Sequence, residues 1–149
     1  SKAVQENGIM LKLNTVVTRA NHSEMMSPLI EKISPDRWKA FQCLHIEGQN
    51  DVAHRRLSVT DDEFELFVQN HRKIILKGGN RPVFERCKDM IGSYLMLSPC
   101  GNLIQNYNGH YVMVPFQAFK DHEIDDLVDV GSFIRRGGEY DWSARNHSG

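Results

Sequence analysis

The chain lacks several features that would assign it to a familiar class of protein. It has three cysteines in 149 residues, and Cys43, Cys87 and Cys100 are too widely spaced for a disulfide framework or a short-spacer metal motif. The formal net charge of −1 argues against a general nucleic-acid-binding protein but is compatible with a local basic pocket. No apolar run reaches the length of about eighteen residues that suggests a membrane span. We therefore expect a globular protein in a reducing, cytoplasmic compartment.

The first eight residues do not have the pattern of a signal peptide. They lack an initial methionine, and Gly8 is typical of the residue that closes a helix. We therefore expect the chain to begin inside a larger protein.

Two apolar segments that carry cations are the most informative pattern in the sequence. Residues 9–17 predict a strand with Lys12 and Asn14 on one face. Arg37 and Lys39 stand two residues apart at the start of the next apolar run, so they point to the same side of a strand. Because buried, unpaired charge is costly, this pair predicts an anionic partner.

The order of elements in the first half predicts a parallel α/β arrangement. A helix over residues 22–33, begun by a capping-box variant of Asn21 and Glu24, lies between the first strand and a second strand at 38–46. The polar loop 47–51 follows at the carboxyl end of that strand, where ligand-binding residues gather in parallel folds.

A second helix is predicted to begin at a capping box formed by Thr60 and Glu63. Its inner stripe includes His71, which we interpret as a packing residue rather than a ligand. Later segments predict a short helix at 83–90, an antiparallel hairpin of 93–97 with 102–105, a strand at 111–114 and a helix at 116–128. Residues 131–143 have too few periodic apolar residues to predict a helix, and only two parallel strands are recognisable.

Several segments, taken in order, carry a resemblance to a known family. They are residues 12–17, 37–44, 46–48, 61–65, 93–95 and 136–143. In this order and spacing they resemble the viperins, radical S-adenosylmethionine (SAM) enzymes of antiviral defence. The resemblance covers most of this chain but only the C-terminal half of a viperin.

The resemblance implies an α/β fold in which residues 1–77 form the last βα units of a partial (β/α)6 radical SAM barrel. Residues 78–149 would form a C-terminal extension with a hairpin, a helix and a tail that covers the substrate. It also implies an enzyme that uses a [4Fe-4S] cluster and SAM to generate a 5′-deoxyadenosyl radical. That enzyme would dehydrate a ribonucleoside triphosphate to its 3′-deoxy-3′,4′-didehydro analogue, a terminator of viral RNA chains. The first expected substrate is CTP, and the alternatives are UTP and GTP.

The resemblance also assigns roles to individual residues. It implies that Lys12, Arg37 and Lys39 hold the triphosphate and that Tyr94 supplies a hydrogen atom or proton in catalysis. It implies that a tail of Arg136, Gly137 and Gly138 covers the phosphates. It also implies that SAM or the nucleotide is contacted by Asn14, Gln42 and Glu47.

One departure from the family leaves alternatives open. The Cys-x-x-x-Cys-x-x-Cys motif that holds the cluster in radical SAM enzymes does not occur in this sequence. We therefore expect this chain alone to lack radical chemistry and to associate with the N-terminal half of a radical SAM domain, or with itself through exposed strand edges. The alternatives are a non-catalytic nucleotide- or polyphosphate-binding module that acts with a partner, and a radical SAM enzyme with another substrate.

Overall fold

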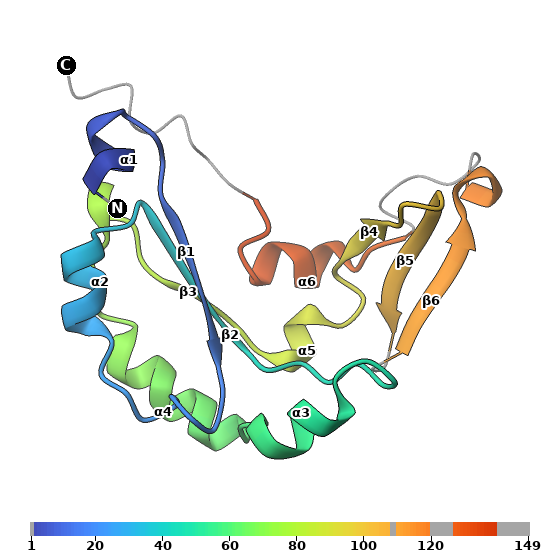
Figure 1. Cartoon of the computed structure of the whole chain (residues 1–149), viewed down its shortest axis with the longest axis horizontal. Helices are drawn as coiled ribbons and strands as arrows, with labels where there is room; N and C mark the ends of the chain where they lie inside the picture. Colours follow the sequence, from blue (N-terminus) through green and yellow to red (C-terminus); the bar gives the residue numbers. More distant parts are fainter. Residues whose placement is uncertain (1, 108–109, 120–126, 140–149) are drawn as a thin grey trace. The chain divides into compact units, whose positions relative to one another are not determined.

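The computed structural model describes residues 2–107, 110–119 and 127–139 (Figure 1). These residues form two compact units, one built from 2–43 and 57–85 and the other from 44–56 and 86–139. Each unit contains its own three-stranded sheet. Residues 140–143, which contribute to the family resemblance, lie outside the described residues.

The first unit is a parallel sheet with helices packed on one face. The strands β1 (Lys12–Val17), β2 (Arg37–Gln42) and β3 (Val83–Glu85) follow one another in the order β1-β2-β3, and both pairings are parallel. The helices α2 (Ser27–Ile33) and α4 (Asp61–His71) cover the same side of this sheet in Figure 1. The predicted α/β class and parallel pairing of the first two strands are therefore confirmed.

The core of this unit lies between the sheet and the helices. Trp38 of β2 is fully buried, and its indole N–H donates to Thr15 Oγ1 at 2.9 Å. Burying each large apolar side chain of this kind stabilises a fold by about 1.5–3 kcal/mol. The buried cluster consists of Val17, Ile30, Trp38, Ala40, Val59, Phe64, Phe67 and Leu76.

The predicted start of α4 is confirmed. Thr60 Oγ1 accepts from the backbone N–H of Glu63, and the Glu63 carboxylate accepts from the backbone N–H of Thr60, which completes the capping box. His71 near its end is fully buried, lies edge-on to Trp38, and accepts a hydrogen bond at Nε2 from the backbone N–H of Met26. The packing role predicted for His71 is confirmed.

The helix α2 begins later than predicted. Asn21 accepts from the backbone N–H of Thr18, so it closes a turn rather than capping a helix. The helix starts at Ser27, with Pro28 in its first turn, where the missing N–H of proline costs little.

A third parallel strand corrects the prediction for residues 83–90. Val83–Glu85 pairs with β2 as β3, and only Cys87–Met90 forms a short helix, α5. The strand is three residues long, too short for a periodic pattern to distinguish it from the start of a helix.

The second unit contains an antiparallel sheet of β4 (Leu95–Leu97), β5 (Asn102–Tyr107) and β6 (His110–Pro115), in that order. The predicted hairpin and third strand are therefore confirmed. The turn is closed by hydrogen bonds from Ser98 N to Asn102 O and from Gly101 N to Ser98 O.

Several shorter helices complete the described residues. Residues 116–119 form a 3-10 turn, η2 (Phe116–Phe119), instead of the start of the α-helix predicted at 116–128, and residues 120–126 are not described. A helix that was not predicted, α6 (Val130–Arg135), is capped by Asp129, whose carboxylate accepts from Ser132 N. The remaining helices are α1 (Lys2–Glu6), α3 (Asp51–Leu57) and η1 (Lys77–Gly79). None of the helices in the described ranges has the length and apolar character needed to cross a membrane.

Candidate functional site

The first unit carries a row of polar groups on the sheet face opposite its core. Lys12, Asn14 and Val16 are the exposed, alternate residues of β1, so Lys12 and Asn14 share one face, as predicted. The parallel register pairs Lys12 with Arg37 and Asn14 with Lys39. Because paired residues in neighbouring strands point to the same side of a sheet, these four residues share one surface, which we call the cationic face.

Packing on the other side of the sheet determines which residues form the cationic face. Trp38 and Ala40 alternate with the two cations of β2 and are both fully buried in the core. Shifting β2 by one residue would bury Arg37 and Lys39 among apolar helices and expose Trp38. The apolar core therefore holds the cations on the opposite side of the sheet, where Arg37 is partly buried and Lys39 is buried.

Lys39 has an anionic partner that the sequence analysis did not identify. Its Nζ lies 2.5 Å from Glu85 Oε1, and the side chains are 5% and 0% exposed respectively. The sequence signal for this pair is a glutamate that ends the apolar segment from Pro82 to Phe84. The anionic partner expected for Lys39 is therefore Glu85, a residue of the protein itself.

Gln42 is not brought to the cationic face. It points to the same side of β2 as Trp38 and Ala40, and its side-chain amide donates to Val59 O at 3.2 Å and to Asp61 Oδ1 at 2.9 Å. These bonds connect the end of β2 to the start of α4, which is a structural contact.

Glu47 belongs to the second unit, in the loop after β2. Its carboxylate lies 2.6 Å from His110 Nδ1 of β6, with both side chains largely exposed. Beside it, Asp51 Oδ1 lies 2.7 Å from His45 Nε2, and this hydrogen bond is the main reason that the pKa of Asp51 is lowered. His54 stacks on His45, and partial burial together with His45 lowers the pKa of His54, which favours its neutral form.

Tyr94 and Arg136 lie together in the second unit. The Arg136 guanidinium carbon is 3.9 Å from the centroid of the Tyr94 ring, and Nη2 donates to Ser93 O at 2.7 Å. Arg136 is 7% exposed. It therefore contacts the predicted catalytic residue, whereas the expected role was contact with phosphates.

The two glycines after Arg136 meet specific backbone requirements. Gly137 has φ +64°, a left-handed conformation that favours glycine. A Cβ atom on Gly138 would lie 2.4 Å from Phe133 Cε2, so this position admits no larger residue without displacing the ring.

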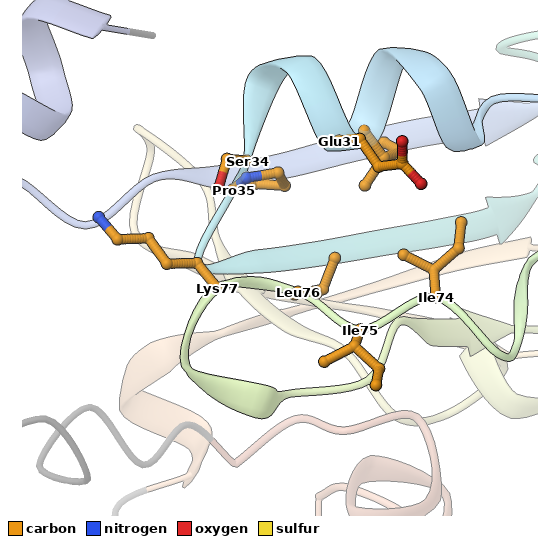
Figure 2. A pocket seen from close by; sticks show the side chains of 8 residues that line it. Glu31, Ser34, Pro35, Ile74, Ile75, Leu76 and Lys77 are labelled. Atoms are coloured by element: carbon orange, nitrogen blue, oxygen red, sulfur yellow. The ribbon is translucent and has the colours of Figure 1, made fainter.

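A hollow of about 200 Å³ lies away from all of the predicted site residues. It is bounded by the end of α2 and by the segment from Ile74 to Lys77 (Figure 2). Most of the residues that line the hollow are apolar, and Glu31 lies at its rim. None of the residues assigned to substrate or SAM lines it.

The described residues do not provide a site for an iron–sulfur cluster. Among residues 2–107, 110–119 and 127–139, no three histidine, cysteine, aspartate or glutamate side chains are grouped so as to hold a metal ion. Cys43 is partly buried, and this burial raises the pKa of its thiol and disfavours the thiolate that binds metals. These residues therefore do not provide the ligands that a [4Fe-4S] cluster requires.

Comparison with known proteins gives a consistent set of relatives. The chain is 33% identical over 150 residues to an S-adenosylmethionine-dependent nucleotide dehydratase of Flammeovirga pacifica, covering 95% of this chain and 48% of the relative. It is 31% identical to the protein of the same name from Lacinutrix mariniflava, covering 97% of this chain and 30% of that protein. It is 29% identical to the S-adenosylmethionine-dependent nucleotide dehydratase RSAD2 of Danio rerio, covering 93% of this chain and 40% of the relative. The chain thus spans less than half the length of these relatives, and no protein-family model matches it.

Proposed function

We propose that this chain, which is homologous to the S-adenosylmethionine-dependent nucleotide dehydratases of the viperin family, supplies the triphosphate-binding part of such an enzyme. The observation that carries the proposal is the cationic face, on which the register pairs Lys12 with Arg37 and Asn14 with Lys39. A guanidinium offers a planar fork of donors to phosphate oxygens, and an ammonium offers a compact charge. Arg37 and Lys12 supply these two kinds of donor to the proposed triphosphate, while Lys39 lies beside them and is paired with Glu85.

The proposed substrate is a ribonucleoside triphosphate, CTP before UTP or GTP, and the proposed product is its 3′-deoxy-3′,4′-didehydro analogue. SAM, when bound, would supply the 5′-deoxyadenosyl radical that begins such a reaction, with release of methionine, on accepting one electron from the cluster. Tyr94 has a phenol, which can deliver a hydrogen atom or a proton late in the reaction. Asn14 stands beside Lys39 on the cationic face and is the proposed contact to SAM or to the nucleotide.

The proposal includes a partner segment. The described residues lack ligands for the cluster, so none of the residue roles proposed for this chain involves holding it. The ligands would come from the N-terminal half of a partial radical SAM barrel. β1 is an edge strand of the described sheet and offers backbone groups to an added strand. Size-exclusion chromatography with light scattering tests this part, because a well-folded monomer that does not bind such a half contradicts it.

Nucleotide binding by this chain tests the main proposal directly. Isothermal titration should detect CTP more strongly than CDP, and cytidine least, because the phosphates supply the contacts. Arg37→Ala should weaken CTP binding by about 2–5 kcal/mol, since it removes a charge-assisted contact and leaves a phosphate without its partner. It also leaves the buried Lys39–Glu85 pair intact. The matched control is Lys32→Ala, which removes an exposed cation from α2 in the same unit. Unchanged affinity in Arg37→Ala would refute the proposed site.

A second function, a non-catalytic nucleotide- or polyphosphate-binding module, is favoured by the lack of a metal-binding group among the described residues. The complete protein, supplied with SAM and each of CTP, UTP and GTP, separates the two functions. Turnover of one nucleotide supports the dehydratase. Binding without turnover of any nucleotide supports the module.

A further inference from the structure

The two described sheets have four edge strands, and β6 differs from the other three. Proteins commonly protect an edge strand from pairing with another chain by keeping it short or by placing charged side chains on it. The edge strands β3 and β4 are three residues long, and β1 carries Lys12. The strand β6 is six residues long and contains no lysine, arginine, aspartate or glutamate. It therefore lacks both of these protections.

The backbone of β6 pairs with β5 on one side, and no other described strand pairs with it on its other side (Figure 1). The N–H of Phe116 donates to Gly101 O at 3.0 Å, one step beyond the paired residues of the two strands. In antiparallel strands, residues bonded to the neighbouring strand alternate with residues whose backbone groups point away from it. Counting back from Phe116, the backbone groups of Pro115, Met113 and Tyr111 point away from β5. Tyr111 and Met113 therefore offer N–H and C=O groups at the open edge, whereas Pro115 has no N–H.

The side chains around this edge are apolar and exposed. Val112 and Met113 are 43% and 63% exposed, and they point to opposite faces of the sheet because they are neighbours in a strand. Leu97 of β4, which lies on the same face as Val112, is 64% exposed. Exposed apolar side chains beside open backbone groups are typical of a surface that binds another chain.

We infer that β6 is an interface with a second copy of this chain, in which the two β6 strands pair antiparallel about a twofold axis at Val112. This pairing places Tyr111 opposite the partner's Met113, so the backbone groups that point away from β5 in one copy meet those of the other. Each such pair exchanges two N–H···O bonds. Centring the axis on Met113 instead would place Tyr111 opposite the partner's Pro115, which has no N–H.

The strand is complementary to itself, which favours a second copy over an unrelated chain. A twofold axis places the strand opposite itself, so a charged strand would bring like charges together. The strand β6 has none of these charges, and Val112 on the axis meets the partner's Val112. The inference concerns the second unit and does not depend on nucleotide binding, which is proposed for the first.

Size-exclusion chromatography of the full chain with light scattering is the first test. The mass should be twice the 17.1 kDa of one chain. Val112→Lys should reduce it to the mass of one chain, because the substitution places two like charges directly opposite each other on the axis. The matched control is Val16→Lys in the edge strand β1, where the valine is also 43% exposed, and this variant should keep the doubled mass. A wild-type mass of one chain, or a doubled mass in Val112→Lys, overturns the inference.

A disulfide across the axis tests the register and provides an independent result should Val112→Lys fail to fold. In antiparallel strands, opposed residues that do not exchange hydrogen bonds have Cα atoms about 4.5 Å apart, within the range that a disulfide spans. Val112→Cys, combined with Cys100→Ser to remove an exposed native cysteine, should therefore form a covalent dimer on mild oxidation. The control is Leu97→Cys in the same background, which lies on β4, two strands away from the axis. Absence of the covalent dimer in Val112→Cys, or equal cross-linking in Leu97→Cys, overturns the pairing.

The concentration dependence of the mass separates a closed pair from open-ended association. A twofold interface uses the β6 edge of both copies and leaves it unavailable to a third. The mass should therefore reach twice that of one chain and stay there as the protein concentration rises. A mass that continues to rise beyond that of two chains overturns the proposed pair.

Discussion

The buried pair between Lys39 and Glu85 supports the most exacting prediction about this protein. Glu85→Gln removes the carboxylate but preserves the size of the side chain, which leaves Lys39 at 5% exposure without its anion. Breaking a buried ion pair at one end typically costs about 3–5 kcal/mol, because the remaining charge stays desolvated. With a urea slope of about 2 kcal/mol per molar, the unfolding midpoint should fall by about 1.5–2.5 M.

The assay is urea unfolding followed by tryptophan fluorescence. Trp142 is replaced by Phe throughout, so that Trp38, in the core of the unit that contains the pair, is the reporter. The matched control is Glu31→Gln, an exposed carboxylate of α2, which should change stability by less than about 0.5 kcal/mol. The double variant Lys39→Met/Glu85→Gln removes both charges and should recover most of the loss.

The double-mutant cycle determines whether the reasoning is correct. A coupling free energy of about 2 kcal/mol or more between the two positions is expected for a buried charge pair. If Glu85→Gln costs less than about 1 kcal/mol and the two substitutions are additive, the pair does not stabilise the sheet and the argument is refuted.

Three further predictions concern other parts of the fold. Thr60→Ala should destabilise the first unit by about 1 kcal/mol because it removes the α4 cap, and Thr60→Asp should not; urea midpoints compare them. Phe67→Ala should cost about 3–5 kcal/mol by opening a cavity in the core, and Phe67→Leu clearly less, as measured by the same assay. Hydrogen bonds from the Ser132 backbone and side chain lower the pKa of Asp129 from 3.8, so the stability it contributes is present above that pH and is lost as the pH falls through the lowered value. Asp129→Asn keeps an acceptor at the cap but should abolish this part of the acid dependence, and an equally steep loss of stability in Asp129→Asn would contradict the assignment.

The sequence by itself determined the features that depend on residues close together in the chain. The apolar runs that carry Lys12 and Arg37 predicted strands, and the capping box of Thr60 and Glu63 predicted the start of α4. The turn at Ser98 predicted the hairpin. Each of these features depends on hydrogen bonds or packing within a few residues, which leave a periodic pattern or a recognisable residue type.

Only the tertiary structure decided the contacts between residues distant in sequence. The strand β3 is three residues long and forms because β2 offers it an edge, so local propensity could not separate it from a helix. Lys39 and Glu85 are 46 residues apart, and Tyr94 and Arg136 are brought together by the attachment of α6 to residues 92 and 93. The sequence identified the cations and the tyrosine, but pairing across the chain determined which groups each of them meets.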